Sequence, residues 1–282
     1  MSFKRMLRKV AKFILSSSSD KKVFVNISQI RNGEILKDKK ILITGGSSGI
    51  GYSIAEKCLS EGAIVTITGR NESKLIKAKE KLNGNIYYIV HDNKDISENG
   101  ELLDKAEAVM GGLDVLVNNA GISLHEGNIL NVSKEGFEST FDINLKSSYF
   151  LTQEFIKKVD KKNLNAQILF ISSETGEQCY DIPYGLTKAS INSLVGALSR
   201  RLYKEGIRVN AIAPGVTESE MTKEYADTKD GNMYRNCASD RIFKPEEIAE
   251  VACFLLSDAS KCISGEVIHC NAGNHLKIYW EE

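Results

Sequence analysis

Tyr184 and Lys188 are the residues of this sequence best suited to proton transfer. They are four positions apart, so on a helix they lie on one face and their side chains can meet. A free tyrosine has a pKa of about 10, and a neighbouring ammonium group lowers it by stabilising the phenolate. Ser172 and Ser173 precede the pair, and either hydroxyl can polarise a substrate oxygen. The group predicts acid–base chemistry at a carbonyl or an alcohol.

A glycine-rich segment near residue 45 has the composition of a phosphate-binding turn. Residues 41–44 look like a buried strand, and a periodic apolar pattern that begins at Ile54 follows the glycines. Glycine adopts positive φ and allows the backbone to approach a ligand. The N–H groups at the start of the next helix would face a pyrophosphate. An ordinary tight turn also fits this pattern when it stands alone.

Three later motifs each come at the end of an apolar segment that looks like a strand. They are Asn118-Asn119-Ala120-Gly121, Ser173 with Gly176, and Pro214-Gly215-Val216. With the spacing Gly-x-x-x-Gly-x-Gly after Thr44 and with Tyr-x-x-x-Lys, the series resembles the short-chain dehydrogenase/reductase family. The resemblance covers about residues 38–274 and points to the non-extended branch, because the Gly-x-x-Gly-x-x-Gly turn and longer C-terminal region of the extended branch are missing.

The resemblance implies an α/β fold in three layers, a Rossmann-like parallel sheet of about seven strands with helices on both faces. We expect strands at 63–68, 86–90, 113–117, 166–171 and 207–213, and a long helical stretch over 133–158. Residues 38–282 would form one catalytic domain, and residues 1–37 an N-terminal extension.

The resemblance also implies roles for the site residues. Tyr184 gives a proton to the substrate oxygen, Lys188 tunes Tyr184 and holds the nicotinamide ribose, and Asn144 supports the proton relay. Ser173 is favoured over Ser172 for polarising the oxygen, because it precedes Gly176 by three residues. Ser173 and Tyr184 are closer in sequence than is usual in the family, so the loop 174–183 is expected to be short.

A nicotinamide cofactor is expected along the carboxyl ends of the strands. The residues implied to bind it are Gly45, Ser47, Ser48, Gly49, Ile50, Gly51, Arg70, Asp92, Asn93, Asn119, Ala120, Gly121, Tyr184, Lys188, Pro214, Gly215, Val216 and Ser219. No carboxylate follows the second strand, and Arg70 offers a planar donor group suited to a 2′-phosphate. NADP(H) is therefore favoured over NAD(H), although Arg70 could instead only solvate a loop.

Overall composition excludes several partner classes. Lys+Arg and Asp+Glu are both 37, so no net charge draws the chain to nucleic acid. The six cysteines form no C-x-x-C pair and the four histidines are scattered, so we expect no metal site and a reduced, cytoplasmic setting. No apolar run reaches the roughly 18 residues of a membrane span.

Two segments outside the motifs carry separate expectations. Residues 1–19 form a basic amphipathic pattern, which fits peripheral contact with the inner face of a membrane, an arm on a partner subunit or a frayed tail. The polar stretch 220–243 predicts a mobile lid over the substrate. A homodimer or homotetramer is expected.

The predicted function is an NAD(P)H-dependent carbonyl reductase or alcohol dehydrogenase. Its small-molecule substrate could be a 3-oxoacyl thioester, a keto-sugar or a small ketone, and the sequence does not choose among them. A hypothesis of a different class is a cofactor-binding sensor or scaffold without turnover. The presence of Ser173, Tyr184 and Lys188 favours the enzyme.

Overall fold

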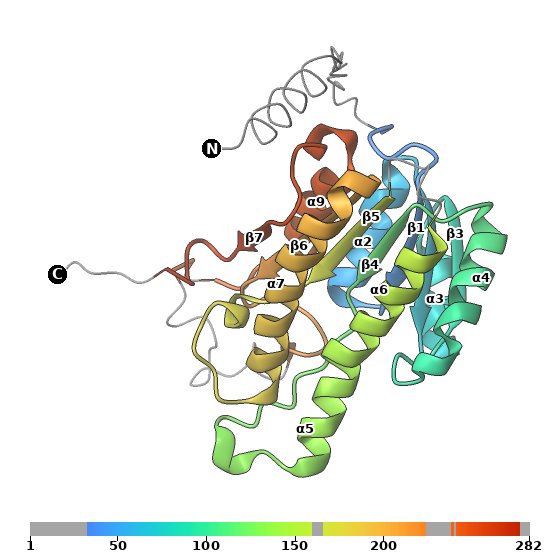
Figure 1. Cartoon of the computed structure of the whole chain (residues 1–282). Helices are drawn as coiled ribbons and strands as arrows, with labels where there is room; N and C mark the ends of the chain where they lie inside the picture. The colour runs from blue at the N-terminus through green and yellow to red at the C-terminus, as the bar shows by residue number, and fades with distance from the viewer. Residues whose placement is uncertain (1–32, 160–165, 224–237, 240, 277–282) are drawn as a thin grey trace, which may run out of the picture.

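Seven short apolar segments form one parallel sheet in the order β3-β2-β1-β4-β5-β6-β7 (Figure 1). The computed structural model describes residues 33–159, 166–223, 238–239 and 241–276. The strands are β1 (Lys40–Thr44), β2 (Ile64–Gly69), β3 (Asn85–Val90), β4 (Val115–Asn118), β5 (Ala166–Ile171), β6 (Ile207–Pro214) and β7 (Val267–Cys270). The predicted fold class is confirmed.

Helices cover both faces of the sheet (Figure 1). On one face lie α2 (Gly49–Ser60), α3 (Glu72–Lys81) and α9 (Pro245–Leu256). On the other lie α4 (Asn99–Met110), α6 (Ser147–Lys158) and α7 (Pro183–Leu202), with α5 (Lys134–Phe141) leading into α6. In the described part of the chain, no helix is both long and apolar enough to cross a membrane.

Alternation along β1 explains why the sheet needs both layers. Ile41 and Ile43 are fully buried on the side of α2 and α9, whereas Leu42 is fully buried on the side of α4 and α6. Parallel strands covered on both faces read as continuous apolar runs for this reason. Each such side chain stabilises the fold by about 1.5–3 kcal/mol relative to exposure.

The strand order reverses between β1 and β4. In open α/β sheets, ligands bind at the carboxyl ends of the strands where the order reverses. The glycine turn follows β1, and the Asn-Asn-Ala-Gly motif follows β4. The topology therefore brings these two motifs together at the expected ligand edge.

The predicted helix over 133–158 is interrupted. After α5, residues Asp142–Lys146 form a π-helical turn before α6 begins. Single π turns inside helices occur frequently at functional sites. Asn144, whose side-chain contacts are described below, lies within this turn.

Two expectations concern segments that lie largely outside the residues described by the structure. The amphipathic segment 1–19 and most of the polar stretch 220–243 lie outside the described residues. Residues 33–37, counted with the extension, contact the domain: Leu36 is fully buried, and Gly33 N donates to Glu61 Oε2 at 2.8 Å.

Candidate active site

The glycine turn after β1 leaves the start of α2 open to an anion. Gly45 and Gly49 have φ of 67° and 56°, which favours glycine at both positions. Ser48, the residue before α2, makes no side-chain cap, and the first turn holds no acidic residue. The N–H groups at this helix end are therefore suited to a phosphate group.

The end of β4 is fastened to this turn by Thr44 and Asn119. Thr44 Oγ1 accepts hydrogen bonds from Asn119 N at 3.0 Å and Ala120 N at 3.1 Å. Asn119 Nδ2 donates to the carbonyl oxygens of Thr44 and Gly45, at 2.9 and 3.0 Å. A Cβ on Gly51 would lie 2.4 Å from Asn119 Nδ2. The Asn119 side chain thus packs against the glycine turn and holds its backbone in place by hydrogen bonds.

Ser173 and Tyr184 meet at the carboxyl end of β5. The Ser173 hydroxyl lies close enough to the Tyr184 side chain to favour its phenolate, and so it acts to lower the Tyr184 pKa. Ser172 is engaged elsewhere, since its Oγ donates to Asn192 Oδ1 at 2.6 Å. Pro183 begins α7 and so fixes Tyr184 in its first turn. The structure places Ser173, the serine favoured by sequence, beside the phenol.

Lys188 lies one turn farther along α7 and is 5% exposed. Its Nζ donates to Ile171 O at 2.8 Å and lies 5.5 Å from the centre of the Tyr184 ring. Burial lowers the pKa of Lys188 to about 8. A Cβ on Gly121 would lie 3.7 Å from this Nζ, which places the end of the Asn-Asn-Ala-Gly motif in the same site.

The pKa of Tyr184 departs from the sequence-based expectation. Burial raises it, the Ser173 hydroxyl acts in the opposite direction, and the nearby Glu174 and Tyr180 raise it further. The expected lowering by Lys188 is not seen in this structure. The physical reason is that desolvation of a phenolate outweighs the other influences on this residue.

Asn144 is held in the π turn by the backbone of Ile122. Asn144 Oδ1 accepts from Ile122 N and Nδ2 donates to Ile122 O, both at 2.8 Å. Thr187, on α7 between Tyr184 and Lys188, has its Oγ1 3.4 Å from Asn144 Nδ2. A Cβ on Gly121 would lie 3.3 Å from Asn144 Oδ1. Asn144 therefore belongs to the same cluster as Lys188.

The remaining implied cofactor residues follow the strand ends. Ser219 Cβ would lie 3.4 Å from a Cβ on Gly49, so Ser219 faces the glycine turn. The β6 end, with Pro214 and Gly215, is joined to β7 by a bond of 3.0 Å from Gly215 N to Cys270 O. Val216, the next residue, accepts from Phe243 N at 2.9 Å.

The adenosine end of the expected site lies beyond β2 and β3. Ser47 Oγ would lie 3.7 Å from a Cβ on Gly69, the residue before the exposed Arg70. Asp92 and Asn93 follow β3, and Asp92 Oδ1 accepts from Lys94 N at 3.0 Å. The structure brings Gly69, the residue before Arg70, near the glycine turn, whereas Asp92 has a local turn role.

Two residues near the site were not identified from the sequence. Thr187 contacts Asn144, as described above. Glu174 is only 8% exposed although it directly follows Ser173, and burial raises its pKa. Glu174 could have been identified from the sequence as a charged residue between an apolar strand end and Gly176.

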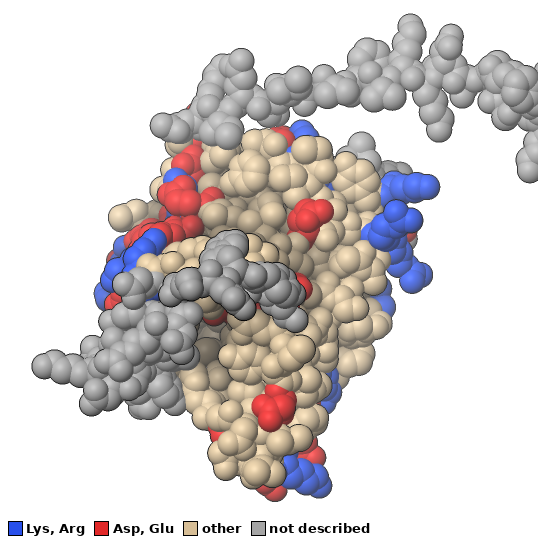
Figure 2. Space-filling view, turned by 90° about the vertical axis from the view of Figure 1, so that its left-hand side faces the viewer, with Lys and Arg blue, Asp and Glu red and all other residues tan. Residues whose placement is uncertain are grey.

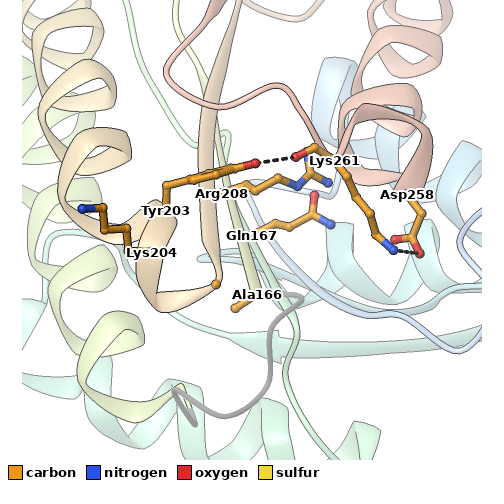
Figure 3. A pocket seen from close by; sticks show the side chains of 8 residues that line it. Ala166, Gln167, Tyr203, Lys204, Arg208, Asp258 and Lys261 are labelled. Carbon is orange, nitrogen blue, oxygen red and sulfur yellow. Dashed lines mark hydrogen bonds and ion pairs between the residues drawn. The ribbon is translucent and has the colours of Figure 1, made fainter. Parts of the chain in front are cut away.

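A pocket of about 280 Å³ lies at the opposite end of the sheet (Figure 3). Its lining includes Ala166 and Arg208, which lie at the amino ends of β5 and β6. Arg208 is buried and donates to the carbonyl oxygens of Leu255, Ser257 and Ser260 at 2.9–3.1 Å, so it caps the end of α9. This pocket is therefore separate from the Ser173–Tyr184 pair.

Metal-ligating side chains do not gather within the described ranges, where no group of three or more His, Cys, Asp or Glu residues could hold an ion. His269 and His275 do meet, with stacked rings 3.7 Å apart. The histidines are scattered along the sequence, but the turn after β7 brings these two into contact.

Comparisons with known proteins agree with this geometry. The family model described as enoyl-(acyl carrier protein) reductase matches residues 45–275. The chain is 33% identical to a 3-oxoacyl-[acyl-carrier-protein] reductase of Thermotoga maritima, over 84% of this chain and 98% of that protein. It is 30% identical to a 3α-hydroxysteroid dehydrogenase of Mediterraneibacter gnavus, over 83% and 96%.

Solved structures show the same likeness. The 3-ketoacyl-(acyl-carrier-protein) reductase of Brucella melitensis, solved with NADH, has a TM-score of 0.79 at 26% identity and covers 86% of this chain and 100% of its own. The region that the family model matches, residues 45–275, contains the glycine turn and the Ser173–Tyr184–Lys188 cluster. The chain therefore belongs to the short-chain dehydrogenase/reductase family and is a nicotinamide-dependent oxidoreductase.

Proposed function

We propose that this chain reduces the ketone of a 3-oxoacyl thioester with NADPH. The observation that carries the catalytic part is the buried Lys188, whose Nζ lies 5.5 Å from the centre of the Tyr184 ring, together with the Ser173 hydroxyl acting on the same phenol. The substrate class is supported by the relatives from Thermotoga maritima and Escherichia coli, both 3-oxoacyl-[acyl-carrier-protein] reductases that match along nearly their whole length.

Each residue of the cluster would have a separate task. Ser173 donates a hydrogen bond to the ketone oxygen, and Tyr184 transfers its proton to that oxygen. Lys188 favours the phenolate that remains, and Asn144 holds the α5–α6 junction against the strand ends so that a proton can be resupplied. The nicotinamide, when bound, supplies the hydride to the carbonyl carbon.

The cofactor residues fit a dinucleotide with a 2′-phosphate. The uncapped start of α2 suits the pyrophosphate, and Arg70 is exposed and directly follows Gly69, which lies near Ser47 of the glycine turn. Several residues of the set named from the sequence, among them Gly45, Asn119 and Gly215, directly follow the carboxyl ends of strands, which supports a cofactor bound along this edge of the sheet. NADPH is accordingly our proposed cofactor.

The decisive test replaces Tyr184 with Phe. The Tyr184→Phe variant should lose about 100-fold or more of the turnover of a 3-oxoacyl thioester, measured by NADPH oxidation, and keep its NADPH affinity. Tyr87→Phe, at an exposed position on β3, is the matched control and should retain activity. A cofactor-binding scaffold would show no turnover in either protein, and a 3-oxosteroid and a keto-sugar in the same panel test the other substrates.

A homo-oligomer is proposed from two exposed surfaces. β7 ends the sheet, and the face of the molecule seen from that side is largely uncharged, with a few acidic side chains on it and both acidic and basic side chains at its margins (Figure 2). On the α5–α6 side, Phe137, Tyr149 and Phe150 are 41%, 45% and 36% exposed. Light scattering after size exclusion measures the assembly directly, and a monomer would refute the proposal.

For the N-terminal extension we propose peripheral membrane contact through residues 1–19. The basic and apolar residues of this segment support it. A chain lacking these residues should keep its fold and activity but lose sedimentation with anionic vesicles, and equal binding of both chains would refute the contact.

A further inference from the structure

Three segments that are far apart in the sequence meet beside the Ser173–Tyr184 pair, and the side chain of Asn274 joins them. Asn274 Nδ2 donates to Glu174 Oε2 at 3.0 Å, and Asn274 Oδ1 accepts from Ala238 N at 3.3 Å. Glu174 directly follows Ser173, Asn274 lies in the turn after β7, and Ala238 lies in the connection between β6 and α9. One amide group in the turn after β7 thus bonds the other two segments.

The chemistry of the partners determines which atom of the amide faces which segment. An ionised carboxylate only accepts hydrogen bonds, and a backbone N–H only donates them. Asn274 satisfies both at once because its amide carries a carbonyl oxygen that accepts and an NH2 group that donates. An aspartate at this position would still accept from Ala238, but it would place a second carboxylate against Glu174.

The turn that carries Asn274 is itself well supported. Asn271 is 1% exposed, and its Oδ1 accepts from Gly273 N at 3.1 Å. The same Oδ1 lies 3.0 Å from His275 Nδ1, and the His275 ring stacks on His269 of β7. Asn274 N also donates to Asn271 O at 3.0 Å. The amide is therefore presented from a braced turn.

Glu174 is linked to the reaction site by charge as well as by sequence. Its negative charge raises the pKa of Tyr184. Burial raises the pKa of Glu174 itself, while the amides of Asn274 and Asn271 and the nearby His275 favour its ionised form. Beyond these groups, Glu177 Oε1 lies 3.9 Å from His269 Nε2.

We propose that Glu174 and Asn274 are positioning residues of the reductase site. Their hydrogen bond holds the loop behind Ser173 against the turn after β7 and against Ala238, and thereby sets the placement of Ser173 relative to Tyr184. Neither residue is assigned contact with the reacting atoms. The inference rests on the proposed function only where turnover is measured.

Three variants test the pair through the polarity of its hydrogen bond. Asn274→Asp places two carboxylates together, so kcat at pH 8 should fall about tenfold with the KM for NADPH unchanged, and should recover toward pH 6 as one proton is shared. Glu174→Gln keeps an acceptor for Asn274, so it should retain most of kcat and lower the pKa of the basic limb of the kcat profile. The double variant, Glu174→Gln with Asn274→Asp, restores a hydrogen bond in which residue 174 donates and residue 274 accepts. Its kcat at pH 8 should recover to within about threefold of that of the original chain.

A second measurement separates this inference from the proposed function. Hydrogen exchange of the peptides that cover 172–182 and 266–276 should rise in Asn274→Asp at pH 8 and return to normal in the double variant, whatever the substrate. Asn85→Asp, at an exposed position on β3, makes the same chemical change and should alter neither readout.

Clear outcomes would overturn the proposal. Unchanged kcat and exchange in Asn274→Asp at pH 8 would do so, and so would a double variant no better than Asn274→Asp alone. If Asn274→Asp does not fold at pH 8, recovery of the folded state in the double variant, followed by thermal unfolding, decides instead. The original chain could show no turnover while exchange still rises in Asn274→Asp and returns in the double variant. That result would count against the proposed function and leave the positioning role supported.

Discussion

Asn144 and Ile122 form a closed pair of hydrogen bonds, in which the side-chain amide of one residue bonds both backbone groups of the other at 2.8 Å. Asn144 is 2% exposed and lies in the π turn between α5 and α6. The pair joins the loop after β4 to this helical segment, and it lies beside Gly121 and Thr187.

Replacing Asn144 with Ala should destabilise the protein. The change leaves the Ile122 N–H and C=O without their partner in a partly buried place, which costs about 1–3 kcal/mol. Urea unfolding measures this loss, and turnover should fall with it because the α5–α6 junction shifts. Asn83→Ala, at an exposed position, is the control and should change the unfolding free energy by less than about 0.5 kcal/mol. Equal stability of both variants would contradict the role given to Asn144.

Lys188 should make stability rise with pH in the absence of cofactor. Its folded pKa is about 8, against 10.5 for an ordinary lysine, so the unfolded chain binds more protons between these values. The unfolding free energy of the original chain, relative to Lys188→Met, should therefore increase by about 1.5 kcal/mol from pH 8 to pH 9.5. Chemical unfolding at each pH measures it. Lys134→Met, at a side chain 81% exposed, should show no such pH dependence, and a flat difference for Lys188→Met would refute the prediction.

Ala272 adopts a backbone conformation that favours glycine, with φ of 53°. Ala272→Gly should stabilise the protein by about 1 kcal/mol, because it removes the Cβ clash of the left-handed region. Thermal or urea unfolding measures the gain. Ala108→Gly, at an exposed position on α4, should have the opposite sign and cost about 1 kcal/mol. A loss of stability in both variants would show that the turn after β7 carries no such strain.

Arg70 should determine the preference between the two nicotinamide cofactors. Arg70→Gln removes a charged donor from the expected 2′-phosphate site, so the Kd for NADPH should rise about tenfold or more while the Kd for NADH stays nearly constant. Fluorescence titration of both cofactors measures this. Arg200→Gln, on the exposed part of α7, is the control. Parallel weakening of both cofactors would mean that Arg70 only supports the local fold.

Local patterns predicted much of this structure. The apolar runs became strands because both faces of the sheet are covered, and Tyr184 and Lys188 share a face of α7 because helical periodicity requires it. The glycine spacing predicted the turn before α2, where two glycines have positive φ.

Other features had no local signal. The helix expected over 133–158 contains a π turn, in which the side chain of Asn144 bonds the backbone of Ile122, 22 positions away. The expected lowering of the Tyr184 pKa is reversed by burial, whose extent depends on every element packed around the phenol.

The sequence by itself determined the fold class, the family and the residue types at each strand end, since these depend on composition and on spacing within a few helical turns. Only the tertiary structure decided that Ser173 and not Ser172 faces Tyr184, that two histidines stack, and that Asn274 bonds Glu174 from 100 positions away. The physical reason is that contacts between distant segments depend on how the strands and their connecting turns pack, which no short-range pattern specifies.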